Sequence, residues 1–432
     1  MALAGISPEG LIEQVLAMGK EFVEIEPEPG LEQEQLKRVL LELLEYEYLI
    51  DIKIKKLPLC FLENCFDHFD NSPSKDKVKS LKCFNCRFNS YCNGFFPEME
   101  DYVKEVPDLP KEVIIEVTDK CNLKCNYCFN RFEYKIKERG TRKELSSEEI
   151  KELLSKIKEF GVGYVRFSGG EPLLRQDLFE LMTYAKKLGL RVWLNTNGTL
   201  VNKQNSKKIC EIVENVLIPL NGFDRESEMA VTNVDSFEAK LKAIGLLQGV
   251  GVVRCGIVLT KSNVENMERF YTLAQNLKIT HLEFYRPIKR GKEDLPTLQK
   301  AVLVIDRLNK KYKKNYKIAN AIPFCFSDPK VIRRVAIGGI YDDGASRMVI
   351  DTNGRAKPNY YWRWNFGSCF EKPLWGIWHS KRFQELRNLV YLPKECNTCS
   401  MVFVCRGGSR ALAILNGNGL QGRDPLMREP IT

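Results

Sequence analysis

Apolar and polar residues follow two different periods through the middle of the chain. From about residue 111, short apolar runs alternate with longer stretches in which apolar side chains recur every three or four residues. The short runs are typical of buried strands and the longer stretches of amphipathic helices, so this order predicts a parallel sheet with crossover helices. The six expected strands are 112–117, 164–167, 191–194, 216–220, 252–259 and 282–285. The helices expected between them include 147–159, which a serine caps, and 178–188.

The N-terminal region shows a different pattern. Four leucines recur there at helical spacing: Leu36, Leu40, Leu43 and Leu44. They predict a helix, and the run 48–54 predicts a strand, so we interpret residues 1–55 as a small segment for packing or for docking a partner. The next segment, 56–106, is dense in cysteine and interrupted by polar residues. It is not expected to form a core of its own, and a bound metal would have to organise it.

The composition is that of an ordinary globular enzyme. The 432 residues are 44% apolar and 28% charged, which is enough for a large core. No apolar stretch is long enough to span a membrane and no signal peptide is recognisable, so we expect a cytoplasmic protein with no membrane partner. Only three histidines are present, which disfavours zinc catalysis and a Ser-His-Asp triad.

The formal net charge of +10 raises the question of a nucleic-acid partner. The lysines are interleaved with glutamates along expected helices, as in 148–158, which is typical of a solvated helix face. We therefore disfavour nucleic acid and assign any basic patch to the docking of an acidic electron donor. The chain also has 15 cysteines, and without a signal peptide these are interpreted as metal ligands rather than disulfides.

The most informative motif is a cysteine triplet, Cys121, Cys125 and Cys128, directly after the first expected strand. Its C-x3-C-x2-C spacing offers three thiolates where a closed metal site needs four, so a bound metal keeps an open position. Zinc sites prefer paired C-x2-C arms, and common ferredoxin motifs supply a fourth cysteine. The triplet therefore predicts an iron-sulfur cluster in which one iron is free for a ligand, which is a catalytic iron.

Two further motifs follow the next two expected strands. Gly169, Gly170 and Glu171 come after the second strand, and Asn195 and Asn197 come after the third. Paired glycines let the backbone approach a ligand closely, and the glutamate can then hold an ammonium group. Because ligands collect at the carboxyl ends of parallel strands, we expect these motifs and the cysteine triplet to form one site.

Together these motifs resemble the signature of the radical S-adenosylmethionine (radical SAM) family. The resemblance implies a partial (βα)6 TIM-like barrel, a 4Fe-4S cluster on the cysteine triplet, and S-adenosyl-L-methionine bound at the open iron. It implies cofactor contacts from the glycine motif, from the two asparagines and from Arg254, since arginine binds carboxylates through two hydrogen bonds. One departure concerns the fourth strand, where many relatives carry Ser-Leu-Asp-Gly and this chain has Pro-Leu-Asn-Gly at 219–222. A serine contact to the cofactor ribose is therefore not expected.

An internal repeat lies outside this region. A C-x2-C-x5-C-x-G motif occurs twice, and each copy follows a similar phrase that contains a further cysteine. The repeat predicts two metal sites, formed by Cys60, Cys83, Cys86 and Cys92 near the N-terminus and by Cys325, Cys396, Cys399 and Cys405 near the C-terminus. The alternative fourth ligands are Cys65 and Cys369. Four thiolates suit an electron-conducting 4Fe-4S cluster or a structural zinc ion, and both interpretations stay open.

The C-terminal segment resembles the SPASM extension of radical SAM enzymes, which carries auxiliary 4Fe-4S clusters. The resemblance rests on 348–354, 375–378 and 405–408. Cysteines that the extension usually has are replaced at three positions, by Asn359, Ser409 and Met427. We therefore expect one auxiliary cluster at this end and a second on the N-terminal repeat. The expected domains are a docking segment (1–55), a cysteine-rich auxiliary cluster segment (56–106), the barrel (107–300) and a SPASM-like domain (301–432).

The resemblance implies that a 5'-deoxyadenosyl radical abstracts a substrate hydrogen while auxiliary clusters move electrons. The extension favours a peptide or protein side chain as substrate, a leader peptide bound through residues 1–55, and reduced ferredoxin or flavodoxin as donor. Two alternatives stay open: a small-molecule or tetrapyrrole substrate, and a non-catalytic electron-transfer or sensor protein. No catalytic base is identified. The polar or aromatic residues expected near the barrel mouth are Tyr285, Arg286, Asp342, Asp343, Arg347, Tyr360 and Tyr361.

Overall fold

The chain divides into two compact units in a computed structural model. The described residues are 8–18, 22–62, 69, 74–83, 86, 92–104, 106, 108–128, 144–288, 294–340, 344–362, 364 and 366–428. The N-terminal unit comprises Met1–Asp108, Asp306–Asn315 and Lys330–Val335, and the barrel unit comprises Leu109–Ile305, Tyr316–Pro329 and Ala336–Thr432. The predicted division into four domains is finer than these two units and stays a prediction.

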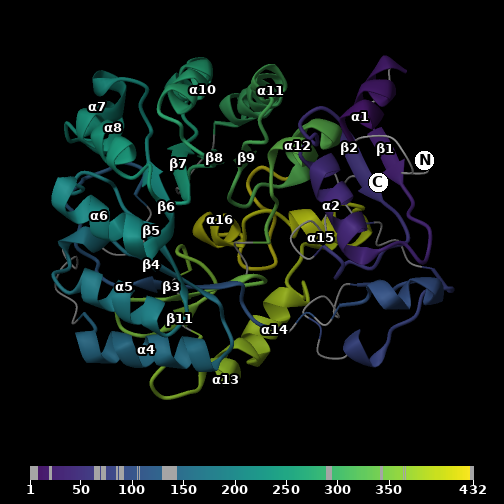
Figure 1. Ribbon diagram of the computed structural model, residues 1–432, viewed down its shortest axis with the longest axis horizontal. Helices are drawn as coiled ribbons and strands as arrows, with labels where there is room; N and C mark the ends of the chain where they lie inside the picture. Colours follow the sequence, from purple (N-terminus) through teal and green to yellow (C-terminus); the bar gives the residue numbers. More distant parts are fainter. Residues whose placement is uncertain are drawn as a thin grey trace. The chain divides into compact units, whose positions relative to one another are not determined.

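Six parallel strands form the centre of the barrel unit (Figure 1). They are β3 (Glu112–Glu116), β4 (Tyr164–Ser168), β5 (Arg191–Asn195), β6 (Val213–Pro219), β7 (Val252–Val258) and β8 (His281–Tyr285). Each pairs in parallel with the next in chain order. The predicted α/β class and the six strands are confirmed, although β6 begins three residues earlier than expected and β8 one residue earlier.

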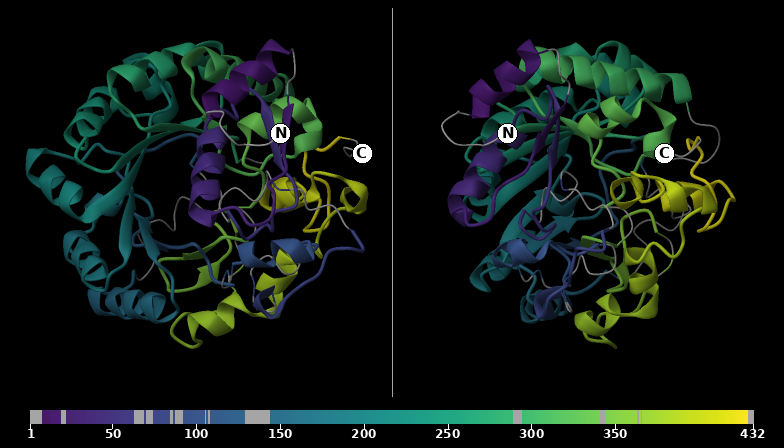
Figure 2. Two further views of the ribbon diagram at one scale, coloured as in Figure 1. Left: turned by 45° about the vertical axis from the view of Figure 1, so that its right-hand side comes forward. Right: turned by 90° about the vertical axis from the view of Figure 1, so that its right-hand side faces the viewer.

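Helices cover one side of this curved sheet, as the teal ribbons of Figure 2 show. They are α4 (Ser147–Glu159), α5 (Leu178–Lys187), α6 (Lys203–Ile212), α7 (Arg225–Thr232), α8 (Phe237–Leu246), α9 (Lys261–Glu265) and α10 (Met267–Asn276), and α11 (Leu295–Tyr312) follows β8. Helix α4 has the predicted bounds because Ser146 and Glu149 form a capping box at its start. Its apolar residues, including Leu153 and Leu154, are buried, so the amphipathic pattern predicts the packed face correctly.

The two faces of the sheet differ in polarity. Alternate residues of the strands are fully buried and apolar, such as Val113 and Val165, and they suit the face that the helices cover. The opposite face is polar, because Arg166 of β4 donates to the Glu112 carboxylate of β3 at 2.8 Å and to Asn195 of β5 at 3.1 Å. The barrel interior is therefore lined by charged groups that neutralise one another.

Three short C-terminal strands extend the same sheet. β10 (Arg347–Ile350) runs parallel to β3, β11 (Ala356–Lys357) pairs antiparallel with β10, and β9 (Lys317–Ile318) continues the sheet beyond β8. The sequence did not predict these strands, because pairing between residues far apart in the chain leaves no local periodicity. The SPASM-like segment therefore shares a backbone ladder with the first strand of the barrel.

The rest of the barrel unit is built from short helices. They are η5 (Pro172–Leu174), η6 (Phe324–Phe326), α13 (Leu374–Trp378), α14 (Lys381–Arg387), η7 (Lys394–Thr398), α15 (Val402–Cys405) and α16 (Arg410–Leu415), and α12 (Pro329–Val335) lies mostly in the N-terminal unit. Trp362, Leu386 and Tyr391 form an aromatic and aliphatic core for this segment. Because these helices are so short, their loops can bring distant cysteines to one place.

The N-terminal unit contains a small parallel sheet with two helices. Its elements are α1 (Pro8–Ala17), β1 (Phe22–Ile25), α2 (Gln33–Leu44), β2 (Asp51–Ile54), η2 (Leu81–Cys83) and η3 (Pro97–Tyr102). All four leucines that predicted α2 are buried, which confirms this helix. Within the described residues, no helix combines the length and the apolar character needed to cross a membrane.

Candidate functional site

The cysteine triplet lies on a loop that directly follows β3, and this loop is anchored to the end of α7. The backbone N–H of Asn126 donates to the carbonyl of Val231 at 3.0 Å, and that of Lys124 donates to the carbonyl of Thr232 at 3.3 Å. The side-chain amide of Asn233 donates to the Lys124 carbonyl at 2.9 Å. These hydrogen bonds hold the cysteine loop against the end of α7.

The three thiols are half-buried, and none of them forms a disulfide. Burial raises the pKa of the Cys125 thiol to about 11, a hydrogen bond from Tyr127 and the Lys240 ammonium oppose that rise, and Cys128 and Cys121 add to it. Three sulfurs that share one electrostatic environment and have no disulfide partner suit a metal cluster, whose positive charge stabilises the thiolates.

Tyr127 and Asn221 support this loop, and the sequence did not single them out for that role. The Asn221 amide donates to the Tyr127 hydroxyl at 2.7 Å, and its oxygen accepts the backbone N–H of Val258 at 2.7 Å. Burial raises the pKa of Tyr127 well above its usual value, so the phenol stays protonated. The motif at 219–222, noted only as a departure from relatives, therefore connects the cysteine loop to the end of β7.

A buried ion pair lies beneath the same turn. Glu228 of α7 accepts the backbone N–H groups of Asn221 at 2.8 Å and of Gly222 at 2.6 Å, and it pairs with the Lys240 ammonium of α8. Both side chains are completely buried. No local pattern predicts this pair, because a glutamate and a lysine on short polar helices usually face solvent.

The glycine motif approaches the cysteine loop itself. Gly170 donates its N–H to the Thr118 carbonyl at 2.7 Å, and Glu171 donates its N–H to the Lys120 carbonyl at 2.7 Å. A Cβ atom on Gly170 would lie 2.1 Å from the Lys120 carbonyl oxygen, and one on Gly169 would lie 2.3 Å from that of Thr118. These glycines are required because the backbone leading into the first cysteine lies directly against them.

A Gly170→Ala substitution is therefore expected to displace the residues that lead into Cys121. We expect the melting temperature, measured under anaerobic conditions, to fall by about 5–10 °C. We also expect the iron held by the cysteine triplet to be lost. The matched control is Gly163→Ala, because a Cβ there meets no atom within 4 Å. Equal melting temperatures and equal iron content for the two variants would contradict the assignment of this contact.

Glu171 is completely buried and accepts three hydrogen bonds. The donors are the N–H of Leu173 at 3.0 Å, the Thr196 hydroxyl at 2.7 Å and the N–H of Asn197 at 2.6 Å. Burial raises the pKa of Glu171 above its usual value, and these bonds oppose that rise. The carboxylate thus ties the second strand end to the third, and its expected role in holding an ammonium group stays a prediction.

The other expected cofactor contacts fall into two groups. Asn197 lies beside the triplet, since its amide nitrogen is 3.9 Å from the Cys121 sulfur and donates to Asn122 at 2.8 Å. Asn195 instead lies in the polar barrel interior, where it contacts the Tyr360 hydroxyl at 3.1 Å. Arg254 lies there as well, donating to Asn215 at 2.8 Å and pairing with Glu283. Its buried Nη2 has no hydrogen-bond partner in the described part of the chain.

The residues expected near the barrel mouth also do not form one group in the structure. Tyr285 donates to the Glu283 carboxylate at 2.5 Å, and Arg347 pairs with Glu112 at 3.3 Å, so both belong to the interior network. Arg286 is completely buried against Asp424 at 2.7 Å, which indicates a structural role. The Tyr361 ring lies tilted beside that of Tyr360, with ring centres 6.4 Å apart. Asp342 and Asp343 lie outside the described residues.

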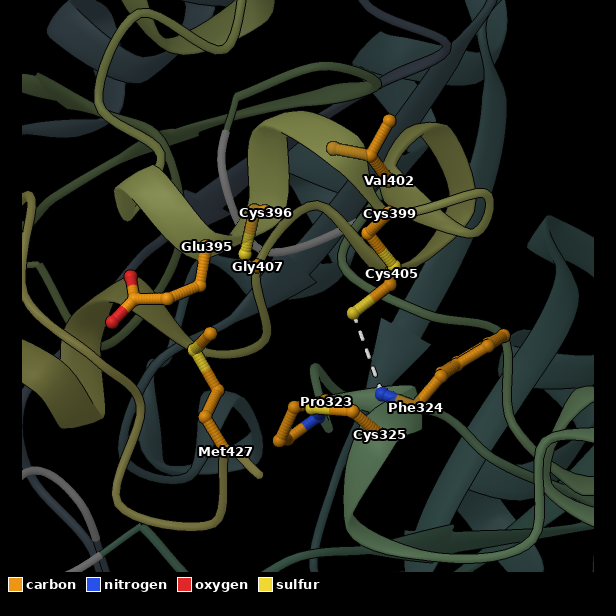
Figure 3. A pocket seen from close by; sticks show the side chains of 10 residues that line it. All are labelled: Pro323, Phe324, Cys325, Glu395, Cys396, Cys399, Val402, Cys405, Gly407 and Met427. Atoms are coloured by element: carbon orange, nitrogen blue, oxygen red, sulfur yellow. Dashed lines mark hydrogen bonds between the residues drawn. The ribbon is translucent and has the colours of Figure 1, made fainter. Parts of the chain in front are cut away.

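The four cysteines of the C-terminal prediction line one pocket, together with Met427 (Figure 3). Cys325 comes from η6, Cys396 from η7, Cys405 from α15, and Cys399 lies between the last two. The N–H of Phe324 points at the Cys405 sulfur at 3.4 Å, and that of Arg428 at the Cys325 sulfur at 3.3 Å. Backbone donors of this kind stabilise cluster thiolates.

The alternative ligand Cys369 is elsewhere. It is fully buried, and its carbonyl accepts the Lys156 ammonium of α4 at 3.0 Å. In the pocket itself, burial raises the pKa of Cys405 to about 12 and that of Cys396 to about 11.

Within the described residues, no three Cys, His, Asp or Glu side chains are already gathered as ligands of a single ion.

Two family profiles match the chain. The radical SAM superfamily profile matches residues 115–277, and the SPASM iron-sulfur cluster-binding domain matches residues 342–400. The chain belongs to the radical SAM superfamily. It is therefore an enzyme, its cofactors are 4Fe-4S clusters and S-adenosylmethionine, and the predicted family, enzyme class and cofactor class are confirmed. The alternative of a non-catalytic electron carrier does not hold.

Two enzymes and one solved structure illustrate what this radical SAM enzyme is similar to. It is 27% identical over 336 residues to the Fe-coproporphyrin III synthase of Methanosarcina barkeri, covering 70% of this chain and 83% of that protein. It is 29% identical over 351 residues to the mycofactocin maturase MftC of Mycobacterium tuberculosis, covering 76% and 85%. Among solved structures, Streptococcus suis SuiB matches with a TM-score of 0.60 and 20% identity, covering 74% of this chain and 78% of that one. At that identity the likeness to SuiB shows the fold alone.

The three SPASM positions that lack cysteine have other contacts. The Ser409 hydroxyl caps α16 by accepting the N–H of Leu412 at 3.2 Å, and the Ser409 N–H donates to Asp424 at 2.6 Å. The Asn359 oxygen accepts the N–H of Tyr361 at 2.8 Å. Met427 lies in the four-cysteine pocket. Ser409 thus caps a helix and Asn359 stabilises a turn, so neither side chain replaces a cysteine as a ligand in the described structure. This agrees with one auxiliary cluster at this end.

The N-terminal cysteines also approach one another. Burial raises the pKa of Cys60 to about 11, and Cys86 and Cys92 lie close enough to add to that rise. Cys83 acts on Cys92 in the same way. The N–H of Lys104 points at the Cys60 sulfur at 3.2 Å, and that of Gly94 at the Cys92 sulfur at 3.3 Å. This arrangement parallels the C-terminal pocket, while the alternative Cys65 lies outside the described residues.

Proposed function

We propose that this enzyme modifies a side chain of a peptide or protein substrate by radical chemistry. The observation that carries the proposal is the combination of an open three-cysteine loop, packed on a glycine motif, with a four-cysteine pocket in the SPASM segment. When bound, the cluster and S-adenosylmethionine supply a radical that removes a hydrogen atom from the substrate. The protein positions the reactants and excludes water from them.

The chain's own residues would divide these tasks. Cys121, Cys125 and Cys128 hold three irons of the catalytic cluster and leave the fourth open. Residues 169–171, with Asn197 beside the first cysteine, hold S-adenosylmethionine. Asn195 and Arg254 face the barrel interior, where the unpartnered Arg254 nitrogen offers a carboxylate contact. The N-terminal and C-terminal four-cysteine sets each hold one auxiliary 4Fe-4S cluster, reduced by a ferredoxin or flavodoxin.

Two of the relatives support a peptide or protein substrate. One is named a maturase, and SuiB has also been solved bound to its precursor peptide SuiA. The SPASM match includes the segment that pairs with the first barrel strand. We propose that a leader peptide binds through residues 1–55, where β1 and β2 form a small sheet.

One observation favours a tetrapyrrole substrate as the second candidate. Three arginines, Arg166, Arg254 and Arg347, lie in the barrel interior and pair there with carboxylates. Tetrapyrroles carry carboxylate side chains, which arginine binds well. A named Fe-coproporphyrin III synthase is among the relatives.

A substrate assay on the anaerobically reconstituted enzyme separates these candidates. The enzyme is reduced with dithionite, given S-adenosylmethionine, and offered either short peptides encoded beside this chain in its own genome or iron coproporphyrin III. We expect one of the peptides to raise 5'-deoxyadenosine formation about tenfold and to change mass. The reason is that a bound substrate places the hydrogen atom to be abstracted next to the radical. Stimulation by the tetrapyrrole alone, abolished in Arg254→Gln, would replace the peptide by the second candidate. No 5'-deoxyadenosine from the loaded, reducible enzyme would contradict both.

A further inference from the structure

A basic run with exposed apolar side chains leads into one of the proposed cluster ligands. The ten residues Ser74–Cys83 contain four lysines and one aspartate. Leu81 is 95% exposed and Val78 is 45% exposed. An apolar side chain as exposed as Leu81 adds nothing to the packing of the described chain, and apolar groups ringed by charge are typical of an interaction surface.

The run is held close to the N-terminal cysteines. Val78 and Phe95 exchange two backbone hydrogen bonds, at 2.8 and 3.0 Å. Gly94 also lies against Val78, since a Cβ atom on this glycine would stand 2.3 Å from the Val78 carbonyl oxygen. The charges of Lys77 and Lys79 act on the Cys92 thiol, two residues before Gly94. Lys77, Val78 and Lys79 are therefore held near the Cys92 sulfur.

We propose that Ser74–Cys83 is the docking surface for a small acidic iron-sulfur protein that reduces the cluster held by Cys60, Cys83, Cys86 and Cys92. Charge complementarity selects the partner, because acidic residues around a donor cluster would meet the lysines while Leu81 fills the centre of the contact. One electron leaves the donor cluster and enters the N-terminal cluster, and no bond or proton changes place. The proposal rests on the proposed function for the cluster itself and adds the surface at which the electron donor docks.

The test measures binding of the reconstituted enzyme to an acidic bacterial ferredoxin with two 4Fe-4S clusters, by anaerobic biolayer interferometry over a salt series. The charge-reversal variant is Lys79→Glu with Lys82→Glu, and Leu81→Ser removes the apolar centre. We expect the charge reversal to weaken binding about tenfold or more at low salt, and the difference to shrink as salt rises. We expect Leu81→Ser to weaken binding about fivefold at every salt concentration.

The matched control reverses two exposed lysines of α6, Lys203→Glu with Lys207→Glu, and should bind ferredoxin as the wild type does. Equal affinity of all variants, or equally tight binding to a DNA duplex of the same charge, would overturn the proposal. A second readout distinguishes failure of the docking proposal from failure of the proposed function. Dithionite needs no docking surface, so dithionite-driven 5'-deoxyadenosine formation should stay within about twofold in the variants while ferredoxin-driven formation falls about tenfold. Absence of dithionite-driven formation in the wild type would contradict the proposed function instead.

Discussion

Replacing Cys121, Cys125 and Cys128 together by alanine is expected to abolish 5'-deoxyadenosine formation and to lower the iron content from about twelve to about eight atoms per chain. The three thiols are the ligands that the loop after β3 offers, and the loop is anchored by hydrogen bonds that alanine leaves in place. The measurement is iron and sulfide analysis after anaerobic reconstitution, with the nucleoside followed after dithionite and S-adenosylmethionine. The remaining eight irons would belong to two auxiliary clusters.

Two controls make this result specific. Cys210→Ala removes a half-buried thiol near the Leu246 carbonyl and should keep all the iron and all the nucleoside. The triple variant of Cys396, Cys399 and Cys405 should lose about four irons but still cleave S-adenosylmethionine without substrate. Zinc in place of the auxiliary iron would reduce the flanking sites to structural ones. Full iron content in the first triple variant would contradict the assignment of the catalytic cluster.

Lys240→Met is expected to lower the free energy of unfolding by about 3–5 kcal/mol, because it leaves Glu228 charged and buried without its partner. Both side chains are completely buried, and the Glu228 carboxylate also holds the backbone of Asn221 and Gly222. That turn carries the Asn221 contact to Tyr127 in the cysteine loop, so we also expect weaker retention of iron by the triplet. The measurements are urea unfolding of the reconstituted protein and the loss of iron to a chelator.

The matched control is Lys242→Met on the same helix, where the lysine is exposed and the effect should stay within about 0.5 kcal/mol. The double variant Glu228→Gln with Lys240→Met removes both charges and should recover part of the stability, because no uncompensated charge then remains. Equal losses for Lys240→Met and Lys242→Met would show that the pair adds nothing to stability.

Much of the barrel could be predicted because its signals are local. The apolar runs and the helical periods placed all six central strands, and the capping residues at Ser146 placed the start of α4. The repeated cysteine spacing selected the four thiols that line the C-terminal pocket, although Cys325 lies far from the other three in the chain. A repeated motif carries information about distant partners that a single copy would not.

Contacts between distant segments could not be predicted in this way. The glycines after β4 pack against the carbonyls before Cys121, a contact that the sequence did not indicate, and their expected contact with the cofactor stays a prediction. Asn195 accepts a hydrogen bond from Arg166 and Arg254 pairs with Glu283, partners that the sequence did not indicate, while the cofactor contacts expected of both residues stay predictions. The orientation of a polar side chain depends on which partner the fold brings near it, and nothing in its local sequence records that partner.

The sequence alone was sufficient for the family and for the six central strands, since periodicity and motif spacing are properties of the chain before it folds. The folded structure was needed for the Glu228–Lys240 pair, for β10 beside β3, and for the exposed Leu81 beside Cys83. Burial and pairing arise only when segments far apart in the chain meet. None of these features could therefore be predicted from the residues that surround it in the sequence.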